Sequence, residues 1–438
     1  MVKKVPLRIA KALVSSLKGG VTPRLGLEHI TVGRKAEIEA LLKDVDLIGE
    51  GGASFRFIVG RYGSGKSFLL QTIRNYTVEK NYVVMDADLS PERRLTGSKG
   101  QGLATYKELI KNMSTKTKPD GGALPLILEK WISNIKNEVL ETTSYEEGSD
   151  EFNKEVKLKI FSVLNSIESL VNGFDFAKIL DMYWQAYLKN DEDKKSNILK
   201  WFRGEYANKT EAKAALGINI IVTDDNWYDY IKIFALFLVQ AGYKGLMLFI
   251  DEIVNIYKIP QLIARQYNYE KILAMYNDIL QGKAMHIGVI MGGTPEAVED
   301  DKRGIFSYEA LRSRLIEGRF SKEGFRDMSA PIIRLEPLTY EEMYILIEKL
   351  ATIHADLYDY TLDINPEDYV NFLKIEYERI GADTLITPRE VIRDFIEILN
   401  IRHQYEDKTI ADIIGDSNFS FAKGEDEADL GGFAEFEL

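Results

Sequence analysis

Residues 55 to 67 read Phe-Arg-Phe-Ile-Val-Gly-Arg-Tyr-Gly-Ser-Gly-Lys-Ser. The apolar first half predicts a β-strand, and the second half fits the pattern G-x-x-x-x-G-K-S ahead of a helix-forming run from Lys66 to about Val78. Glycines let the backbone curl so that its N–H groups face the phosphates of a nucleotide. The sequence therefore predicts a phosphate-binding P-loop for ATP, formed by Gly60, Arg61, Tyr62, Gly63, Ser64, Gly65, Lys66 and Ser67.

Two side chains of this loop have distinct expected roles. Lys66 should reach the β- and γ-phosphates, and the hydroxyl of Ser67 should ligate Mg²⁺. The alternative is a glycine-rich turn without a nucleotide. A strand directly before the loop and a helix directly after it both favour the P-loop.

A second acidic motif follows an apolar run. Leu246 to Ile250 predicts a buried strand, and Asp251 and Glu252 come directly after it. Ligands of α/β sheets bind at the carboxyl ends of the strands. We expect Asp251 to hold Mg²⁺ through water and Glu252 to orient the attacking water, although acidic residues after strands also serve as helix caps.

Further apolar runs predict the rest of the sheet. Strands are expected at Tyr82–Asp86, Gly245–Ile250, His286–Met291 and Pro331–Leu335, each apolar enough to be buried on both faces as parallel strands are. Strands that alternate with helices indicate an α/β fold with a doubly wound parallel sheet.

The interval between the second and third strands is too long for one crossover helix. Apolar residues recur there at helical spacing, as at Leu124, Leu128, Trp131 and Ile135, which predicts a large helical insertion. A second stripe comprises Ile160, Leu164, Ile167 and Val171. We expect an N-terminal segment bordering the nucleotide site at 1–50, an ATPase core at 51–336 with the insertion at about 97–240, a helical lid at 337–404 and an acidic flexible tail at 405–438.

Candidate residues downstream match positions that AAA+ ATPases use. Thr294 follows the fourth strand, where it could sense the γ-phosphate, but Thr294 before Pro295 is also an ordinary helix N-cap. Arg312 and Arg314 lie on an expected helix before the fifth strand and could act as an arginine finger for a neighbouring subunit. The sequence does not choose between the two arginines.

Two other segments suit a nucleotide site. Thr387 and Glu390 form an expected capping box, so Arg389 lies in the first helical turn, where its charge opposes the helix dipole and matches the second sensor position of an AAA+ lid. Gly33 and Arg34 resemble the segment that borders the adenine pocket in initiator-type AAA+ proteins.

Composition excludes several classes of function. The 438-residue chain has no cysteine, so disulfides, thiolate metal sites and cysteine nucleophiles are impossible, and its four histidines lack ligand spacing. We expect a cytoplasmic protein without a membrane segment. The net charge of −12 disfavours a protein covered in nonspecific nucleic-acid contacts, although the N-terminus is basic, with Lys3, Lys4, Arg8, Lys11 and Lys18.

Taken together, several segments resemble the P-loop ATP-binding proteins of BREX-type phage-defence systems (BrxD-like), which are AAA+, initiator-like ATPases. The segments are Val-Gly-Arg at 32–34, the P-loop, Phe-Ile-Asp-Glu-Ile at 249–253, Gly-Gly-Thr-Pro-Glu at 292–296 and Tyr-Glu-Ala-Leu at 308–311. The resemblance implies a homo-oligomer, with a defence-system helicase or DNA-modification proteins as partners and DNA as a possible one.

Three functions remain open from the sequence. The first is an AAA+ ATPase that hydrolyses Mg-ATP to assemble or remodel a phage-defence complex on DNA. The second is a slow nucleotide-controlled switch of the STAND type. The third is an initiator-like DNA-binding module, which the short acidic C-terminal region disfavours because it leaves little room for a basic helix-turn-helix.

Overall fold

The computed structural model describes residues 4–168, 170–316, 326–380, 387–405 and 408–415. The described chain divides into two compact units. Unit 1 comprises the described parts of residues 1–35, 62–68 and 335–438, and unit 2 comprises residues 36–61 and 69–334. The domain boundaries expected from the sequence stay a prediction.

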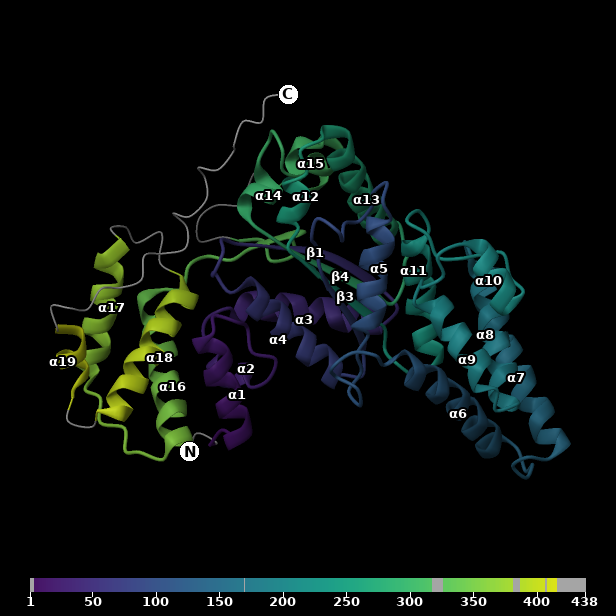
Figure 1. Cartoon of the computed structure of the whole chain (residues 1–438), viewed down its shortest axis with the longest axis horizontal. Helices are drawn as coiled ribbons and strands as arrows, with labels where there is room; N and C mark the ends of the chain where they lie inside the picture. Colours follow the sequence, from purple (N-terminus) through teal and green to yellow (C-terminus); the bar gives the residue numbers. More distant parts are fainter. Residues whose placement is uncertain (1–3, 169, 317–325, 381–386, 406–407, 416–438) are drawn as a thin grey trace. The chain divides into compact units, whose positions relative to one another are not determined.

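Unit 2 contains a parallel sheet in the order β2-β3-β4-β1-β5. Its strands lie within two residues of the expected positions, because each run is largely apolar and mostly buried. The strands are β1 (Ala53–Val59), β2 (Val83–Asp88), β3 (Leu246–Asp251), β4 (Ile287–Gly293) and β5 (Ile332–Arg334). Figure 1 shows α3 (Lys35–Gly49) below the strands and α13 (Leu262–Leu280) above them in that view.

The insertion between β2 and β3 consists of helices and connecting loops in the described residues, with isolated β-bridges only at Ser114, Thr115 and Lys118. Helices α6 to α10 form a cluster to the right of the strands in Figure 1, and all four residues of the first predicted stripe are buried on α6. The second stripe was wrong at one position: α7 ends at Glu168, and Val171 is 71% exposed. The insertion helices are α5 (Gln101–Lys111), α6 (Leu124–Thr142), α7 (Asp150–Glu168), α8 (Gly173–Leu188), α9 (Glu192–Phe202), α10 (Lys209–Leu216) and α11 (Trp227–Gln240).

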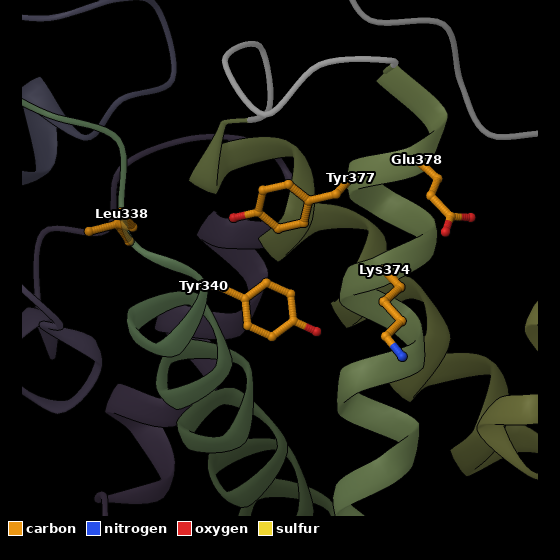
Figure 2. Close-up of a pocket in the computed structure, with 5 residues that line it drawn as sticks. All are labelled: Leu338, Tyr340, Lys374, Tyr377 and Glu378. Carbon is orange, nitrogen blue, oxygen red and sulfur yellow. The ribbon is translucent and has the colours of Figure 1, made fainter.

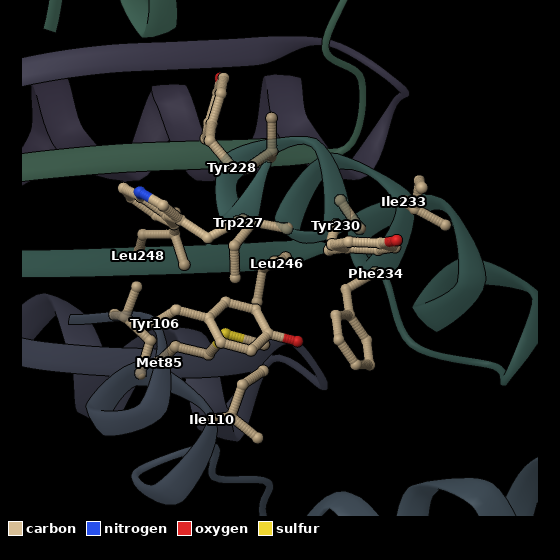
Figure 3. Packing of buried hydrophobic residues seen from close by; sticks show 14 of the residues in the cluster. Met85, Tyr106, Ile110, Trp227, Tyr228, Tyr230, Ile233, Phe234, Leu246 and Leu248 are labelled. Carbon is tan, nitrogen blue, oxygen red and sulfur yellow. The ribbon is translucent and has the colours of Figure 1, made fainter. Parts of the chain in front are cut away.

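Aromatic residues join the insertion to the sheet. Figure 3 shows Tyr106 of α5 and Trp227 of α11 packed around Met85 and Leu248 of the strands. The buried indole of Trp227 donates a hydrogen bond to the Leu95 carbonyl (3.0 Å), which satisfies its polar atom. Beyond β3, the helices of unit 2 are α12 (Val254–Tyr257), α13, α14 (Pro295–Glu299), the 3₁₀ helix η1 (Ile305–Ser307) and α15 (Glu309–Leu315).

An ion pair anchors the first strand. Arg56 of β1 binds Asp44 of α3 through Nε (2.6 Å) and a second nitrogen (2.8 Å), and it also donates to the carbonyls of Ser329 and Ala330 ahead of β5. Because both side chains are largely buried, each charge depends on the other for compensation.

Unit 1 has its own helical core. The apolar face of α1 packs on α16 and α18 and buries Leu13 and Leu17, while Phe68 of α4 (Lys66–Glu79) lies against the same core. The expected capping box is present on α18, Thr339 and Glu342 form a second one on α16, and Ile410 and Ile413 of α19 are buried. Most of the predicted acidic tail, residues 416–438, lies outside the described residues. The other helices are α1 (Leu7–Lys18), α2 (Leu27–Ile30), α16 (Tyr340–Tyr358), α17 (Pro366–Ile380), α18 (Pro388–Gln404) and α19 (Ile410–Gly415).

The expected fold class is confirmed. The P-loop segment follows β1, a long helical insertion separates β2 from β3, and helices follow β5. This is the AAA+ P-loop arrangement that the sequence predicted. In the part of the chain that the structure describes, no helix is both long and apolar enough to cross a membrane.

Candidate nucleotide site

The P-loop has the backbone curvature that phosphate binding requires. Gly63 (φ 74°) and Gly65 (φ 95°) are both in the left-handed region, which a side chain would disfavour. The Ser64 hydroxyl is buried without a hydrogen-bond partner among the described residues, and a Cβ on Gly65 would meet nothing within 4 Å. Open space beside a curled backbone and an unsatisfied hydroxyl fit a bound phosphate group.

The side chains of the loop differ in exposure. Lys66 begins α4 and is only 9% exposed, and its Nζ lies 5.3 Å from the ring centroid of Tyr62. Arg61 and Tyr62 are exposed, whereas Gly60 is buried and its N–H donates to the Gly293 carbonyl at the end of β4 (3.1 Å). The first residue of the loop is thereby fixed to the sheet.

Within unit 1, two predicted segments contact the P-loop. The Arg34 guanidinium donates to the Ser64 carbonyl (3.2 Å), and Gly33 and Arg34 both have positive φ. The carboxylate of Glu342 lies 2.7 Å from the position of a Cβ on Gly33, so a side chain there would displace this carboxylate. Of the two residues expected to border the adenine pocket, Arg34 thus contacts the loop backbone.

The start of α18 contacts the loop as well. The Thr387 hydroxyl lies 2.6 Å from the position of a Cβ on Gly63, and Thr387 caps α18. Arg389 follows in the first turn, with its Cδ 4.0 Å from the position of a Cβ on Gly20. The predicted sensor Arg389 is therefore two residues from a direct contact with the P-loop.

Within unit 2, Asp251 and Glu252 lie at the end of β3. The Asp251 Oδ1 accepts a hydrogen bond from the Glu252 N–H (2.8 Å), and it lies 2.2 Å from the position of a Cβ on Gly292 of β4. Asp88 is paired with Asp251 in the sheet register. Asp88 is exposed at the end of β2, but partial desolvation by its surroundings, and then the Asp251 charge, raise the pKa of its carboxyl above the usual value. Gly292 and Asp88 were not predicted; the Gly292-Gly293 pair inside a strand was the available signal.

The other predicted residues of unit 2 have local partners. Thr294 is buried and caps α14, accepting from the Ala297 N–H (3.3 Å), as the alternative interpretation expected. Arg312 lies 3.4 Å from the exposed Asp301 carboxylate, and Arg314 donates to the Asn277 side chain (3.2 Å). The roles assigned to these residues stay predictions.

A hollow in unit 1 contains none of the predicted site residues in its lining. Leu338, Tyr340, Lys374, Tyr377 and Glu378 line it, and Figure 2 shows the two tyrosine rings between α16 and α17. Their ring centroids are 5.7 Å apart. None of these lining residues belongs to the P-loop or makes one of the P-loop contacts described above.

Comparison with known families decides the assignment. The family model of the BREX system ATP-binding protein BrxC/D matches residues 5–418. The chain belongs to this family. The resemblance that was based on the sequence motifs is confirmed. The family description names ATP binding, and the P-loop is a motif suited to it.

Other comparisons add less. Among solved structures, one match is the Aeropyrum pernix ORC2 protein in its ADPNP-ADP complexes, with 12% sequence identity over 86% of this chain and 71% of that chain and a TM-score of 0.30. Among curated proteins, the comparison finds no significant match. The family assignment therefore rests on the family model.

Proposed function

We propose that this protein is an ATP hydrolase that binds Mg-ATP and uses its hydrolysis to assemble or remodel a phage-defence complex on DNA in the cytoplasm. The observation that carries the proposal is the complete P-loop after β1 together with Asp251 and Glu252 at the end of β3. Membership of the BREX ATP-binding family supports the defence context.

Each residue has a chemical role in this proposal. The curled backbone of residues 63–65 and Lys66 bind the phosphates, and Ser67 and Asp251 are the groups that would hold Mg²⁺. Bound Mg²⁺ would neutralise charge on the phosphates. Glu252 orients and polarises the attacking water.

Thr294 and Arg389 are proposed sensors of the γ-phosphate. The hydroxyl of Thr294 is buried at the end of β4, and the charge of Arg389 lies where a helix dipole alone would disfavour it. Arg314 is exposed on α15 and Arg312 is partly exposed, so both are accessible to a neighbouring subunit in a homo-oligomer. Either would stabilise charge on the transferring phosphoryl group.

Turnover and binding measurements on two variants test the hydrolase. Lys66→Ala should lose tight ATP binding, whereas Glu252→Gln should bind ATP normally and hydrolyse it at least about 100-fold more slowly. Wild-type turnover by Glu252→Gln would remove Glu252 from the reaction. Nucleotide-dependent assembly without measurable turnover in the wild-type protein would instead favour the STAND-type switch.

The DNA part of the proposal is supported by α1. Its apolar face is buried in the unit 1 core, and this leaves Arg8, Lys11 and Lys18 exposed. Spacings of three and seven residues place these three cations on one helical face. Such a stripe on a chain of net charge −12 is suited to phosphates of nucleic acid.

Charge substitution tests this better than deletion, because deleting α1 would remove buried residues. Replacing Arg8, Lys11 and Lys18 by Gln should weaken duplex binding. The negative slope of log K against log salt should become shallower by roughly 2.7, because three phosphate contacts are lost. The same number of substitutions at exposed Lys154, Lys157 and Lys178 of the insertion provides the control. If the ATP-loaded protein binds neither duplex nor single strands at low salt, a partner must supply the DNA contact.

A further inference from the structure

Glu252 has a strained backbone. Its φ is 59°, in the left-handed region, which a residue with a side chain rarely adopts unless its surroundings hold it there. The conformation turns the chain sharply between β3 and α12. This turn sets the position from which the Glu252 side chain leaves the backbone. The groups that hold the turn therefore also hold the proposed catalytic side chain.

Asn255 is one of the groups that hold this turn. Its Nδ2 donates to the Glu252 carbonyl (3.3 Å) and to the Leu89 carbonyl (2.9 Å), and its backbone N–H donates to the Glu252 carbonyl as well (3.0 Å). Leu89 directly follows β2. A single amide therefore ties the peptide of Glu252 to the end of the adjacent strand.

The residues on either side of Glu252 are also fixed. The Glu252 N–H donates to Asp251 Oδ1 (2.8 Å), and the Ile253 N–H donates to the Gly292 carbonyl of β4 (3.1 Å). These bonds fix the turn to β3 and β4. On the β2 side, the Leu89 N–H donates to the Asp251 carbonyl (3.0 Å), and the Asn255 side chain adds a bond from Leu89 to the turn itself.

Asparagine is suited to this position because its NH₂ group offers two donors from one atom. An aspartate, which has the same shape, would instead place a negative carboxylate without donors against two carbonyl oxygens, which would repel it. An ordinary turn-forming asparagine would need only its local bond to residue 252, whereas the bond to Leu89 spans 166 residues of sequence. The long-range bond is what distinguishes this arrangement from a local turn.

We propose that Asn255 is a positioning residue for the hydrolysis reaction, which keeps the left-handed backbone of Glu252 in place by bonding its carbonyl to the end of β2. The inference rests on the proposed role of Glu252. It does not give Asn255 a contact with the nucleotide. Asn255 acts only through Glu252, so its effect should depend on the presence of the glutamate.

Steady-state turnover and ATP affinity of Asn255→Ala provide the first test. We expect kcat to fall about 10- to 100-fold, the range typical of a misplaced catalytic group, with the Kd for ATP within about twofold of wild type. The matched control is Asn134→Ala, which removes a similar amide-to-carbonyl bond, to Ala241 (3.0 Å), in the insertion. The control should leave kcat unchanged.

A double-mutant cycle separates positioning from a merely structural role. In the Glu252→Gln background, measured by single turnover, adding Asn255→Ala should lower the rate by less than about twofold. Equal losses in the two backgrounds would overturn the inference, as would wild-type turnover by Asn255→Ala. Asn255→Gln, which keeps both donors on a longer side chain, should lie between wild type and Asn255→Ala, and it serves if the alanine variant does not fold.

The failures of the two proposals are distinguishable. If Glu252→Gln hydrolyses ATP at the wild-type rate, the proposed catalytic role of Glu252 fails and this inference fails with it. If Glu252→Gln is inactive while Asn255→Ala is fully active, only the inference about Asn255 is wrong.

Discussion

The Asp251 carboxylate occupies the space in which a side chain on Gly292 would begin. A Cβ on Gly292 would lie 2.2 Å from Asp251 Oδ1 and 2.9 Å from its Cγ, closer than atoms approach without a shift. Asp251 of β3, whose carboxylate is proposed to hold Mg²⁺, can therefore take this position only because residue 292 of β4 is a glycine.

Gly292→Ala should consequently impair Mg²⁺ use more than ATP binding. Moving a group that holds a metal typically costs about 10- to 100-fold in metal affinity, so half-maximal turnover should need correspondingly more Mg²⁺. A titration of turnover against Mg²⁺ measures this. The matched control is Gly288→Ala, nearer the start of β4, where the new Cβ meets the Met247 side chain of β3. This variant should leave the Mg²⁺ requirement unchanged.

Thr387→Ala should lower both the stability of α18 and the affinity for ATP. Loss of the N-cap costs about 1 kcal/mol, and the contact between Thr387 and Gly63 of the P-loop is lost as well. Thr339→Ala removes the equivalent cap of α16 and serves as the control. Equal ATP affinity in the two variants, measured by titration calorimetry, would show that the Thr387 contact does not influence the loop.

Hydrolysis should require a neighbouring subunit if Arg312 or Arg314 is an arginine finger. Turnover per chain should then rise with protein concentration, and mixing Glu252→Gln with the Arg312→Ala, Arg314→Ala double variant should restore part of the activity. Arg314 already bonds Asn277 and the Ala310 carbonyl, whereas Arg312 reaches only an exposed carboxylate at 3.4 Å among the interactions described. We therefore expect the single variant Arg312→Ala to be the less active one. Flat concentration dependence and an inactive mixture would contradict the shared site.

Acid should destabilise unit 1 through His354. This side chain is fully buried, its Nδ1 lies 3.0 Å from the Tyr360 hydroxyl, and burial lowers its pKa from 6.5 to about 4. Between these values the unfolded chain binds a proton that the folded chain does not, so stability falls as the pH drops from 6.5 to 4. Urea unfolding at several pH values should show a smaller decrease for His354→Phe than for the wild type. The same decrease in both proteins would exclude His354 as the cause.

Local patterns in the sequence determined the elements and the principal motif. The five strands, both capping boxes and the P-loop with its flanking strand and helix depend on residues close together in the chain, and their physical causes act over a few residues. The error at Val171 has the same origin. The apolar spacing continued past Glu168, but the helix ended there, and the Asn172-Gly173 dipeptide, which is typical of turns, was the available signal of that end.

Only the tertiary structure decided which distant residues meet. Gly292 makes room for Asp251, Asn255 bonds the Leu89 carbonyl, and Thr387 contacts Gly63. These are contacts between residues far apart in sequence. Their close approach is set by the parallel register of β2, β3 and β4 or by the packing of the unit 1 helices. A glycine pair inside a strand indicates a close approach, and a threonine before a proline indicates a helix cap, but neither pattern names the distant partner, because the fit depends on shape at a particular place in the fold.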